Sequence, residues 1–289
     1  YQAVCVNGVL FAEVSGKLRF EATIQSDFPT VGDFVMLDRC NNKNGNAIIH
    51  HVLHRKSLFV RKAAGKVNEE QVVAANIDIV FLCMSLNKDF NIHRLERYLS
   101  LTWESGAIPV VVLTKSDLCD NVYRKLQVVN SIALGVDVVV TSSIEPDGYK
   151  QISKYIKPGC TVALLGSSGV GKSSLINCLM GGEFLNTKEI RIDDDKGRHA
   201  TTRRELFLIS GGGIVIGTPG MRELGMWDVS EGLDKSFADI EAYFGKCHFR
   251  NCTHTSEPGC AIWEAIAHQE LSPKRWESHR RLKTEAVFA

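Results

Sequence analysis

The chain has 289 residues, of which 44% are apolar and 23% are charged, and its net charge is +1. This length predicts about two domains, with room for a small third, at roughly 150 residues each. The balanced charge argues neither for nor against a nucleic-acid partner. No apolar run approaches the roughly 20 residues that span a membrane, so no membrane association is expected.

The start of the chain and its cysteines favour the same compartment. No basic segment followed by an apolar core stands at the N-terminus, so no secretory signal is expected. Six of the nine cysteines are scattered, mostly through apolar segments, as is typical of reduced thiols. We therefore expect a cytoplasmic protein, and we expect it to be a monomer.

Residues 1–70 are predicted to form a unit of short strands. Apolar or alternating segments at 1–11, 17–24, 33–37 and 47–54 are separated by turns rich in glycine and asparagine. Strands at this spacing predict a small β-barrel, and five strands of the oligonucleotide-binding type fit the size.

Basic residues cluster at the end of this unit. The cluster comprises Arg55, Lys56, Arg61, Lys62 and Lys66, although basic residues exceed acidic ones here by only two. A nucleic-acid contact and a solvated charged face fit the cluster about equally well.

Residues 71–227 change to strands that alternate with helices. Strands are predicted at 77–83, 108–113, 136–140, 162–165, 205–209 and 213–216. Helices are predicted at 92–104, 122–134 and 174–180. Continuous apolar strands separated by helices predict a mostly parallel sheet covered on both faces. Right-handed crossovers then place the loops that follow the strands along one edge, where ligands bind.

A glycine-rich segment between the strand 162–165 and the helix 174–180 fits G-x-x-x-x-G-K-[ST], the pattern of a phosphate-binding loop. Its backbone N–H groups and the helix N-terminus face an anion. Lys172 is predicted to reach the β- and γ-phosphates, and Ser173 to bind Mg²⁺. The predicted nucleotide-binding residues of the loop are Gly166, Ser167, Ser168, Gly169, Val170, Gly171, Lys172, Ser173 and Ser174.

A second nucleotide-binding element follows the strand 108–113. Its residues Thr114, Lys115, Ser116 and Asp117 resemble the N-K-x-D element with which GTPases read guanine. An aspartate here accepts hydrogen bonds from guanine N1–H and N2–H₂, which adenine cannot supply, and such a site rejects the wrong base by on the order of 10⁴. Lys115 can cover the base. Ser142, after the next strand, is predicted to line the O6 side.

Two mobile elements are expected downstream of the loop. Thr201 and Thr202 are placed like the segment that closes on Mg²⁺ and the γ-phosphate, so Thr202 is a predicted magnesium ligand. Residues 217–220 follow the strand 213–216 and are placed like the D-x-x-G element, whose final glycine, Gly220 here, senses the γ-phosphate.

The order of these elements is that of a circular permutation. An ordinary GTPase runs phosphate loop, mobile threonine, D-x-x-G and N-K-x-D, whereas the base reader comes first here. The site survives permutation because it depends on where strand ends meet in space. The mobile segments then lead straight into the C-terminal region, to which the chain itself can pass a nucleotide-driven change.

Residues 228–289 are predicted to form a small helical domain, with helices at 232–244, 260–268 and 272–285. Its loop carries C-x₄-C-x-H-x₅-C, which suits one closed, tetrahedral, structural zinc site made by Cys247, Cys252, His254 and Cys260. Zinc would hold so small a domain folded. His248 is the competing nitrogen ligand, and free cysteines beside a surface histidine are the alternative to a metal site.

The last predicted helix is basic. It carries Lys274, Arg275, Arg280, Arg281 and Lys283. These side chains fit a face that contacts RNA phosphates, and a solvated helix face is the alternative.

This order of elements, with a β-barrel before it and a Cys/His loop behind it, resembles the small-ribosomal-subunit-dependent GTPases of the RsgA type. Stretches at 29–33, 61–65, 71–78 and 221–225 match too, so the resemblance covers essentially the whole chain. It implies an oligonucleotide-binding-type barrel (1–70), a circularly permuted GTPase domain (71–227) and a zinc domain (228–289). It also implies rRNA binding, GTP hydrolysis stimulated by the small subunit, and a role in late maturation of that subunit.

Three positions depart from the ordinary GTPase pattern. Thr114 replaces asparagine, and its hydroxyl is predicted to donate to guanine N7. Gly217 replaces the D-x-x-G aspartate, which predicts weaker Mg²⁺ binding and slower hydrolysis. Met221 stands where many GTPases carry a water-orienting glutamine, so either His199 or a ribosomal element is expected to position the water. The predicted catalytic residues are Lys172, Thr202 and His199.

Two other functions compete with a ribosome-dependent GTPase. One is a nucleotide-switched rRNA-binding protein with impaired hydrolysis, which Gly217 makes credible. The other is an ATP-using kinase or ATPase on the same phosphate loop, against which Asp117 argues.

Overall fold

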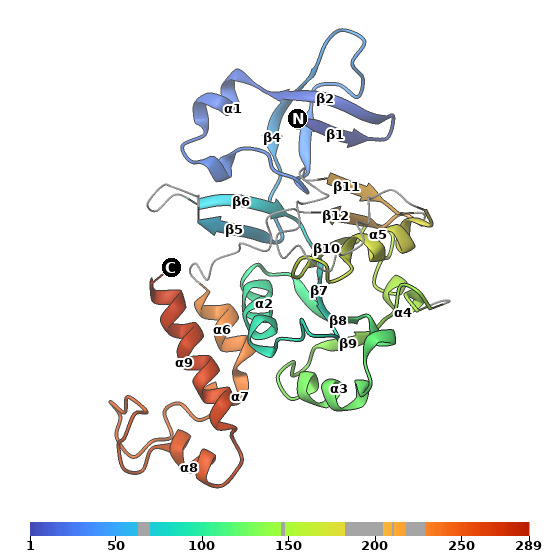
Figure 1. Cartoon of the computed structure of the whole chain (residues 1–289). Helices are drawn as coiled ribbons and strands as arrows, with labels where there is room; N and C mark the ends of the chain where they lie inside the picture. The colour runs from blue at the N-terminus through green and yellow to red at the C-terminus, as the bar shows by residue number, and fades with distance from the viewer. Residues whose placement is uncertain (63–69, 146–147, 183–204, 210, 218–228, 289) are drawn as a thin grey trace.

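The computed structural model of the protein describes residues 1–62, 70–145, 148–182, 205–209, 211–217 and 229–288. An N-terminal sheet, a central sheet flanked by helices and a group of C-terminal helices follow one another along the chain (Figure 1). Within these ranges no helix has the length and apolar character needed to cross a membrane.

The N-terminal sheet has four strands in the order β1-β2-β4-β3. Their bounds are β1 Gln2–Cys5, β2 Gly8–Val14, β3 Val35–Leu37 and β4 Ala47–Val52. Strands β2 and β4 run parallel, and the other neighbours run antiparallel. One face packs into a small core of Leu10, Ala12, Ala47 and Ile49. The sheet is therefore an open, half-barrel form of the predicted barrel.

The strand predicted at 17–24 is wrong, because Gly16–Glu21 form helix α1, followed by the 3₁₀ turn η1 (Gln25–Asp27). Ser15 caps the helix, since its hydroxyl accepts a hydrogen bond from the backbone N–H of Leu18 at 3.0 Å. The alternation of Leu18 and Phe20 with polar residues suggested a strand. However, Phe20 is 90% exposed and packs against no second layer.

A tight turn at residues 29–33, just before β3, packs against an antiparallel hairpin that follows the sheet in the chain. The hairpin strands are β5 (Leu58–Lys62) and β6 (Glu70–Ala75). Gly32 has a φ of +90°, and a Cβ built there would lie 2.1 Å from the carbonyl oxygen of Ala75, so only glycine fits. Asp33 pairs with Arg55 at 2.7 Å. Arg55 is thereby held in a structural ion pair, which separates it from the predicted basic cluster.

The central sheet has six strands in the order β11-β12-β10-β7-β8-β9. Their bounds are β7 Ile79–Ser85, β8 Ile108–Thr114, β9 Asp137–Val140, β10 Thr161–Leu165, β11 Glu205–Leu208 and β12 Ile214–Gly217. The helices between them are α2 Ile92–Glu104, η2 Ser116–Leu118, α3 Val122–Asn130, α4 Lys150–Ser153 and α5 Lys172–Met180. All neighbours are parallel except β11 with β12, so the prediction of a mostly parallel sheet is confirmed.

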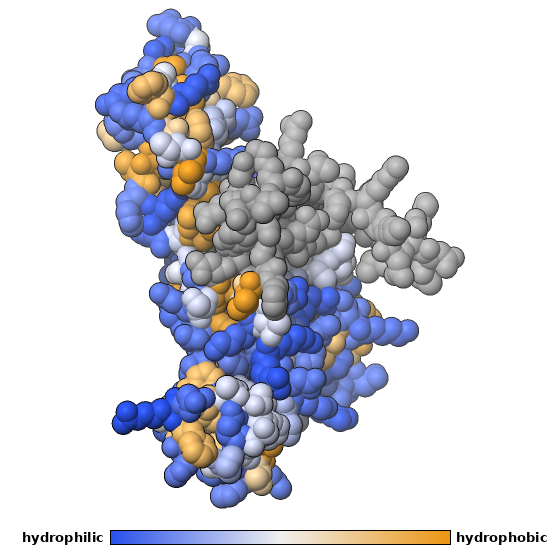
Figure 2. All heavy atoms as spheres, turned by 90° about the vertical axis from the view of Figure 1, so that its left-hand side faces the viewer, coloured by the Kyte–Doolittle hydropathy of each residue, from blue (hydrophilic) through white to orange (hydrophobic). Residues whose placement is uncertain are grey.

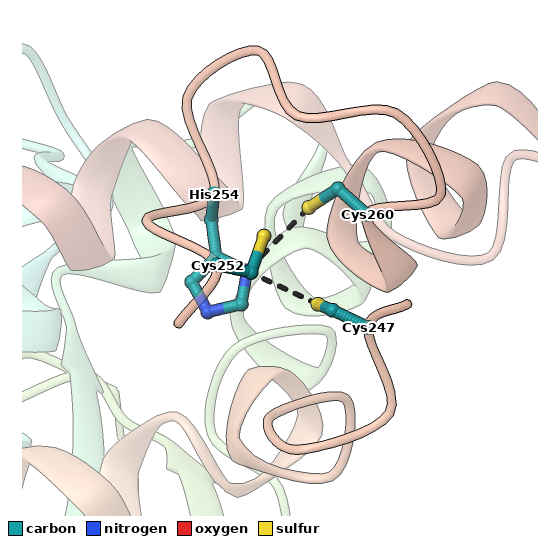
Figure 3. Close-up of side chains that lie close together, drawn as sticks. All are labelled: Cys247, Cys252, His254 and Cys260. Atoms are coloured by element: carbon teal, nitrogen blue, oxygen red, sulfur yellow. Dashed lines mark hydrogen bonds between the residues drawn. The ribbon is translucent and has the colours of Figure 1, made fainter. Parts of the chain in front are cut away.

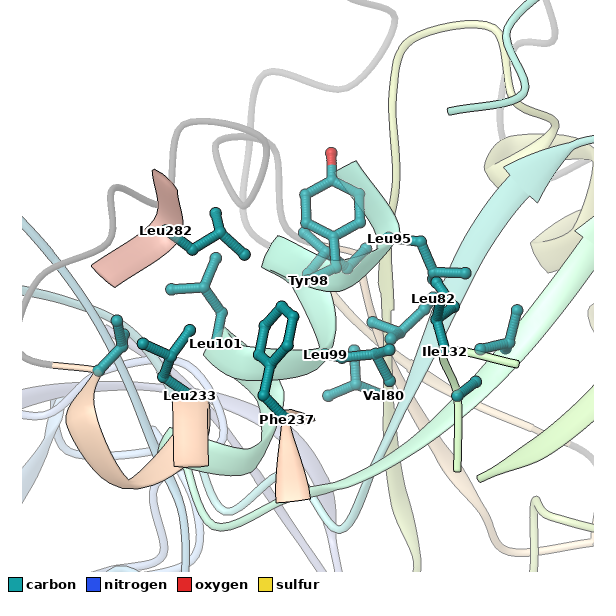
Figure 4. Close-up of a cluster of buried hydrophobic side chains, with 14 of the residues drawn as sticks. Val80, Leu82, Leu95, Tyr98, Leu99, Leu101, Ile132, Leu233, Phe237 and Leu282 are labelled. Atoms are coloured by element: carbon teal, nitrogen blue, oxygen red, sulfur yellow. The ribbon is translucent and has the colours of Figure 1, made fainter. Parts of the chain in front are cut away.

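Successive residues of β7 enter two different cores. Val80 and Leu82 join the cluster that includes α2, whereas Phe81 and Cys83 join the cluster on the opposite face. Figure 4 shows the first cluster, in which Leu99 of α2 lies between Val80 and the C-terminal helical segment. The sheet is thus covered on both faces, which explains why its strands are continuously apolar.

The C-terminal helices pack beside α2 (Figure 1). They are α6 Ser230–Ser236, α7 Ala238–Glu241, α8 Ala261–Ala267 and α9 Pro273–Phe288. Arg275 of α9 is buried and donates to Glu96 of α2 at 2.9 Å and to Asp239 at 3.0 Å. It therefore joins two helices and does not belong to the exposed basic face of α9 that the sequence suggested.

Candidate nucleotide site and zinc centre

Loops that follow three strands meet at the carboxyl edge of the central sheet. They are the segments after β8, β9 and β10, which begin at Lys115, Thr141 and Gly166. The backbone N–H of Ser116 donates to the carbonyl of Thr141 at 3.2 Å, so the first two loops are joined directly. The edge is the place where a parallel sheet binds ligands.

The predicted phosphate loop turns tightly between β10 and α5. Gly169 and Gly171 have φ values of +70° and +100°, which side chains rarely adopt. A Cβ at Gly166 would lie 2.5 Å from the carbonyl oxygen of Cys83, so the loop starts flush against β7. Lys172 donates from Nζ to the carbonyls of Gly166 and Ser167 at 2.7 and 2.6 Å. Its ammonium group therefore lies across the loop.

The base-reading segment is fastened to that loop. The Thr114 hydroxyl donates to the carbonyl of Val170 at 2.6 Å, and Lys115 Nζ donates to the carbonyl of Gly169 at 2.6 Å. Lys115 has a φ of +57°, a left-handed conformation that turns the chain sharply after β8. Residues that are 54 and 56 positions apart in the chain thus form one site.

The Thr114 hydroxyl, which is predicted to donate to guanine N7, has a partner within the protein in this structure. A hydroxyl has one proton, and that proton is used in the bond to Val170. Thr114 is buried, so this bond fastens the base-reading segment to the phosphate loop.

Asp117, which is predicted to read the guanine base, is held in position by a neighbouring side chain. The Ser142 hydroxyl donates to Asp117 Oδ1 at 2.7 Å, which orients the carboxylate from the β9 side. A Cβ at Gly148 would lie 2.2 Å from the Ser142 carbonyl oxygen. Gly148 was absent from the sequence prediction, because its need for glycine arises only from this close backbone approach.

The predicted residues His199, Thr202 and Gly220 lie outside the described residues, as do Thr201 and Met221. Gly217 is described and ends β12, the strand from which the D-x-x-G element would start. It has no carboxylate to offer a Mg²⁺ ion.

Asp89 is a site residue that the sequence prediction missed. It lies in the loop between β7 and α2, and its Oδ2 accepts a hydrogen bond from the Ser167 hydroxyl at 2.5 Å. No local motif marks it, because its partner is 78 residues away in the chain.

The four predicted zinc ligands come together in the C-terminal part (Figure 3). The Nδ1 atom of His254 lies 3.4 Å from Sγ of Cys247, 3.6 Å from Sγ of Cys252 and 3.4 Å from Sγ of Cys260. Zinc bonds of about 2.3 Å to sulfur and about 2.0 Å to nitrogen put tetrahedral donors about 3.5 Å apart. The donor set therefore fits zinc, and His248 is not part of it.

Neighbouring groups hold these ligands in place. The ring of Phe244 stacks on His254 at 4.9 Å, and Trp263 donates from its indole N–H to the His254 carbonyl at 3.2 Å. Burial, with smaller contributions from the sulfurs of Cys247 and Cys260, raises the pKa of the Cys252 thiol to about 11. A divalent cation supplies the charge that favours thiolates in such a cluster.

Comparison with known proteins gives consistent matches. The sequence model of the family described as RsgA GTPase matches residues 52–227. The protein named small ribosomal subunit biogenesis GTPase RsgA 2 of Lactiplantibacillus plantarum is 45% identical over 288 residues, covering 100% of this chain and 80% of the relative. The RsgA protein of Methanosarcina acetivorans is 42% identical over 261 residues, covering 90% and 70%.

Solved structures agree with these matches. The crystal structure of YjeQ from Thermotoga maritima has a TM-score of 0.70 at 27% identity, covering 98% of this chain and 92% of that one. YloQ, described as a circularly permuted GTPase, has a TM-score of 0.66 at 26% identity, covering 96% and 86%. The permuted order of base reader and phosphate loop is thus shared with a known architecture.

Proposed function

The chain belongs to the RsgA GTPase family, and from this premise we propose that it hydrolyses GTP in the late maturation of the small ribosomal subunit. The observation that carries the proposal is the junction of the base reader with the phosphate loop, made by Thr114 with Val170 and by Lys115 with Gly169. A guanine nucleotide bound there spans both segments. The relatives reported above are named GTPases, which favours hydrolysis over the alternative of a switch with impaired turnover.

In this proposal each part of the site has one task. The backbone of the phosphate loop and Lys172 bind the phosphates, and Asp117, oriented by Ser142, reads the base. Ser173 holds Mg²⁺, with Thr202 as its second protein ligand. Gly220 contacts the γ-phosphate, and His199 or a ribosomal group positions the water.

The proposed RNA contacts lie at both ends of the molecule. The N-terminal sheet exposes apolar and aromatic side chains, among them Val9, Phe11 and Phe34. Figure 2 shows such side chains interspersed with hydrophilic ones over this end. Exposed aromatic rings are stacking surfaces for unpaired bases. At the other end α9 exposes Lys274, Arg280, Arg281 and Lys283, which suit phosphates.

The proposal also covers the compartment, the oligomeric state, the metal ion and the domains. We place this protein in the cytoplasm as a monomer that carries one structural zinc ion, held by Cys247, Cys252, His254 and Cys260. We place its functional units at 1–70, 71–227 and 228–289. The family model ends at residue 227, as this middle unit does, but it begins at residue 52, within the first unit.

Nucleotide competition tests the proposed site. GTP and GDP are expected to displace a fluorescent guanine nucleotide from the full chain, whereas ATP at a hundredfold higher concentration is not. Asp117→Ala should remove this preference, and Lys172→Ala should weaken the binding of both guanine nucleotides. Equal displacement by ATP and GTP would contradict the assignment of Asp117 and revive an ATP-using enzyme.

A further inference from the structure

The loop between β7 and α2 contacts the phosphate loop through the side chain of Asp89. Within it Asp89 accepts the hydroxyl proton of Ser167 at 2.5 Å. Ser167 has its carbonyl oxygen engaged as well, since Lys172 Nζ donates to it at 2.6 Å. One residue of the phosphate loop therefore connects a carboxylate to the ammonium group that contacts the nucleotide.

The Asp89 carboxylate is itself held in a fixed position. Its backbone N–H donates to Oδ1 of Asn87 at 3.0 Å. Arg94, in the first turn of α2, lies 2.8 Å from Asp89 Oδ1 and also donates to the Asp89 carbonyl. Both carboxylate oxygens thus have a partner, one on α2 and one on the phosphate loop.

The charges around Asp89 suit a positioning role. A bare carboxylate beside the phosphates would repel them, but Arg94 balances its charge. With its charge balanced, the Asp89 carboxylate is a hydrogen-bond acceptor that holds the Ser167 side chain in one rotamer. The bond ties the phosphate loop to α2, so the loop cannot shift without breaking it.

We propose that Asp89 is a positioning residue for hydrolysis, which acts through Ser167 to hold Lys172 in register with the β- and γ-phosphates. This inference rests on the proposed nucleotide site. It adds to that site a residue from a loop that none of the nucleotide motifs includes. Asp89 contacts neither nucleotide nor metal in this role.

The test is a double-mutant cycle on intrinsic GTP hydrolysis by the full chain. Ser167→Ala removes the hydroxyl alone, and Asp89→Ala removes its acceptor. Each variant is expected to lower kcat roughly tenfold or more, because small displacements of a catalytic group are costly, while the affinity for GDP changes less. Asp89→Ala made in the Ser167→Ala background should change kcat no more than about twofold, since the shared contact is already absent.

Conservative and remote variants separate positioning from folding. Asp89→Asn keeps an acceptor oxygen and should recover part of the lost rate. Asp137→Ala removes an exposed carboxylate away from the loop, which accepts a hydrogen bond from the Tyr155 hydroxyl at 2.7 Å. This control variant should leave kcat unchanged. Melting temperature is measured for each protein, because a purely structural role would lower it and leave kcat of the folded fraction intact.

The Lys172→Ala variant distinguishes a failure of the positioning role from a failure of the proposed nucleotide site. If Lys172→Ala abolishes hydrolysis while Ser167→Ala and Asp89→Ala hydrolyse GTP at the native rate, the positioning role is refuted and the nucleotide site stands. Independent, additive losses in the double variant would also refute it. If Lys172→Ala hydrolyses GTP normally, the nucleotide site itself is misassigned.

Discussion

The Thr114 hydroxyl has a single proton and donates it to the Val170 carbonyl. An asparagine amide has two N–H donors, so one can keep this bond while the other reaches the base. The residue that replaces asparagine in this chain therefore keeps the contact that fastens the loop, and we expect it to make one contact fewer to guanine.

We expect Thr114→Asn to bind GTP and GDP more tightly, by roughly three- to tenfold for one added hydrogen bond. Thr114→Val keeps the shape and loses the proton, so it should bind both nucleotides more weakly than the native chain. Equilibrium titration with a fluorescent guanine nucleotide measures both effects. Native affinity in Thr114→Val would show that the bond to Val170 is dispensable.

Site residues that lie close together in the chain could be predicted from the sequence, whereas residues whose partners are distant in the chain could not. The phosphate loop and the zinc ligands each lie within a short segment whose spacing reflects their chemistry, and the four zinc donors do converge. Asp89 and Gly148 became recognisable only from their distances to Ser167 and Ser142. Arg55 and Arg275 were assigned to basic surfaces because a sequence does not show their buried partners.

At the scale of elements, helix α2 links the central sheet to the C-terminal helices. Glu96 and Arg275 form a buried ion pair between α2 and α9, with side chains that are 2% and 6% exposed. Nearby, His93 of α2 and the hydroxyl of Ser278 on α9 lie 2.7 Å apart. A buried ion pair adds little when intact, but removing Glu96 leaves the buried Arg275 paired with the partly exposed Asp239.

We therefore expect Glu96→Ala to lower the free energy of unfolding by about 3 kcal/mol, measured by urea denaturation. Arg97 and Glu285 join the same two helices through a pair with side chains that are 41% and 32% exposed. Arg97→Ala should cost less than about 1 kcal/mol, because water screens exposed pairs. Equal losses in the two variants would contradict a specific role for the buried pair.

The predicted elements were most reliable where an apolar segment is buried on both sides. The continuous runs of the central sheet are strands, and 92–104 is the helix α2. The strand predicted at 17–24 is wrong. The alternating apolar residues of this short segment are mostly exposed and so bury little surface, and the Ser15 cap stabilises a helix instead. Local propensity and capping prevail where no second layer fixes the choice.

At the scale of the whole molecule, the zinc cluster is expected to hold the loop between α7 and α8. Purified protein should contain one equivalent of zinc. Chelation should break the bond from the indole of the exposed Trp263 to the His254 carbonyl, and so change the tryptophan fluorescence. Cys252→Ser should lose the metal, whereas Cys119→Ser, which lies outside the cluster, should retain it. Full zinc content in Cys252→Ser would contradict the ligand set.

The central sheet and the C-terminal helices are connected in two ways. In the sequence, the residues that are predicted to close on the nucleotide precede the C-terminal helices, while the structure adds a second connection through α2. That helix follows the Asp89 loop at one end and holds Arg275 further along. Asp89, Arg94 and the pair of Glu96 with Arg275 thus join the phosphate loop to α9 through α2.

The most direct measurement is GTP hydrolysis by the full chain with and without purified small ribosomal subunits, with Gly217→Asp alongside. We expect the subunits to stimulate hydrolysis by both proteins, and the Asp variant to need less Mg²⁺ because it regains a carboxylate at the end of β12. Absence of stimulation in both proteins would contradict a ribosome-dependent GTPase, and stimulation of the Asp variant alone would show that the native chain is a switch with impaired hydrolysis.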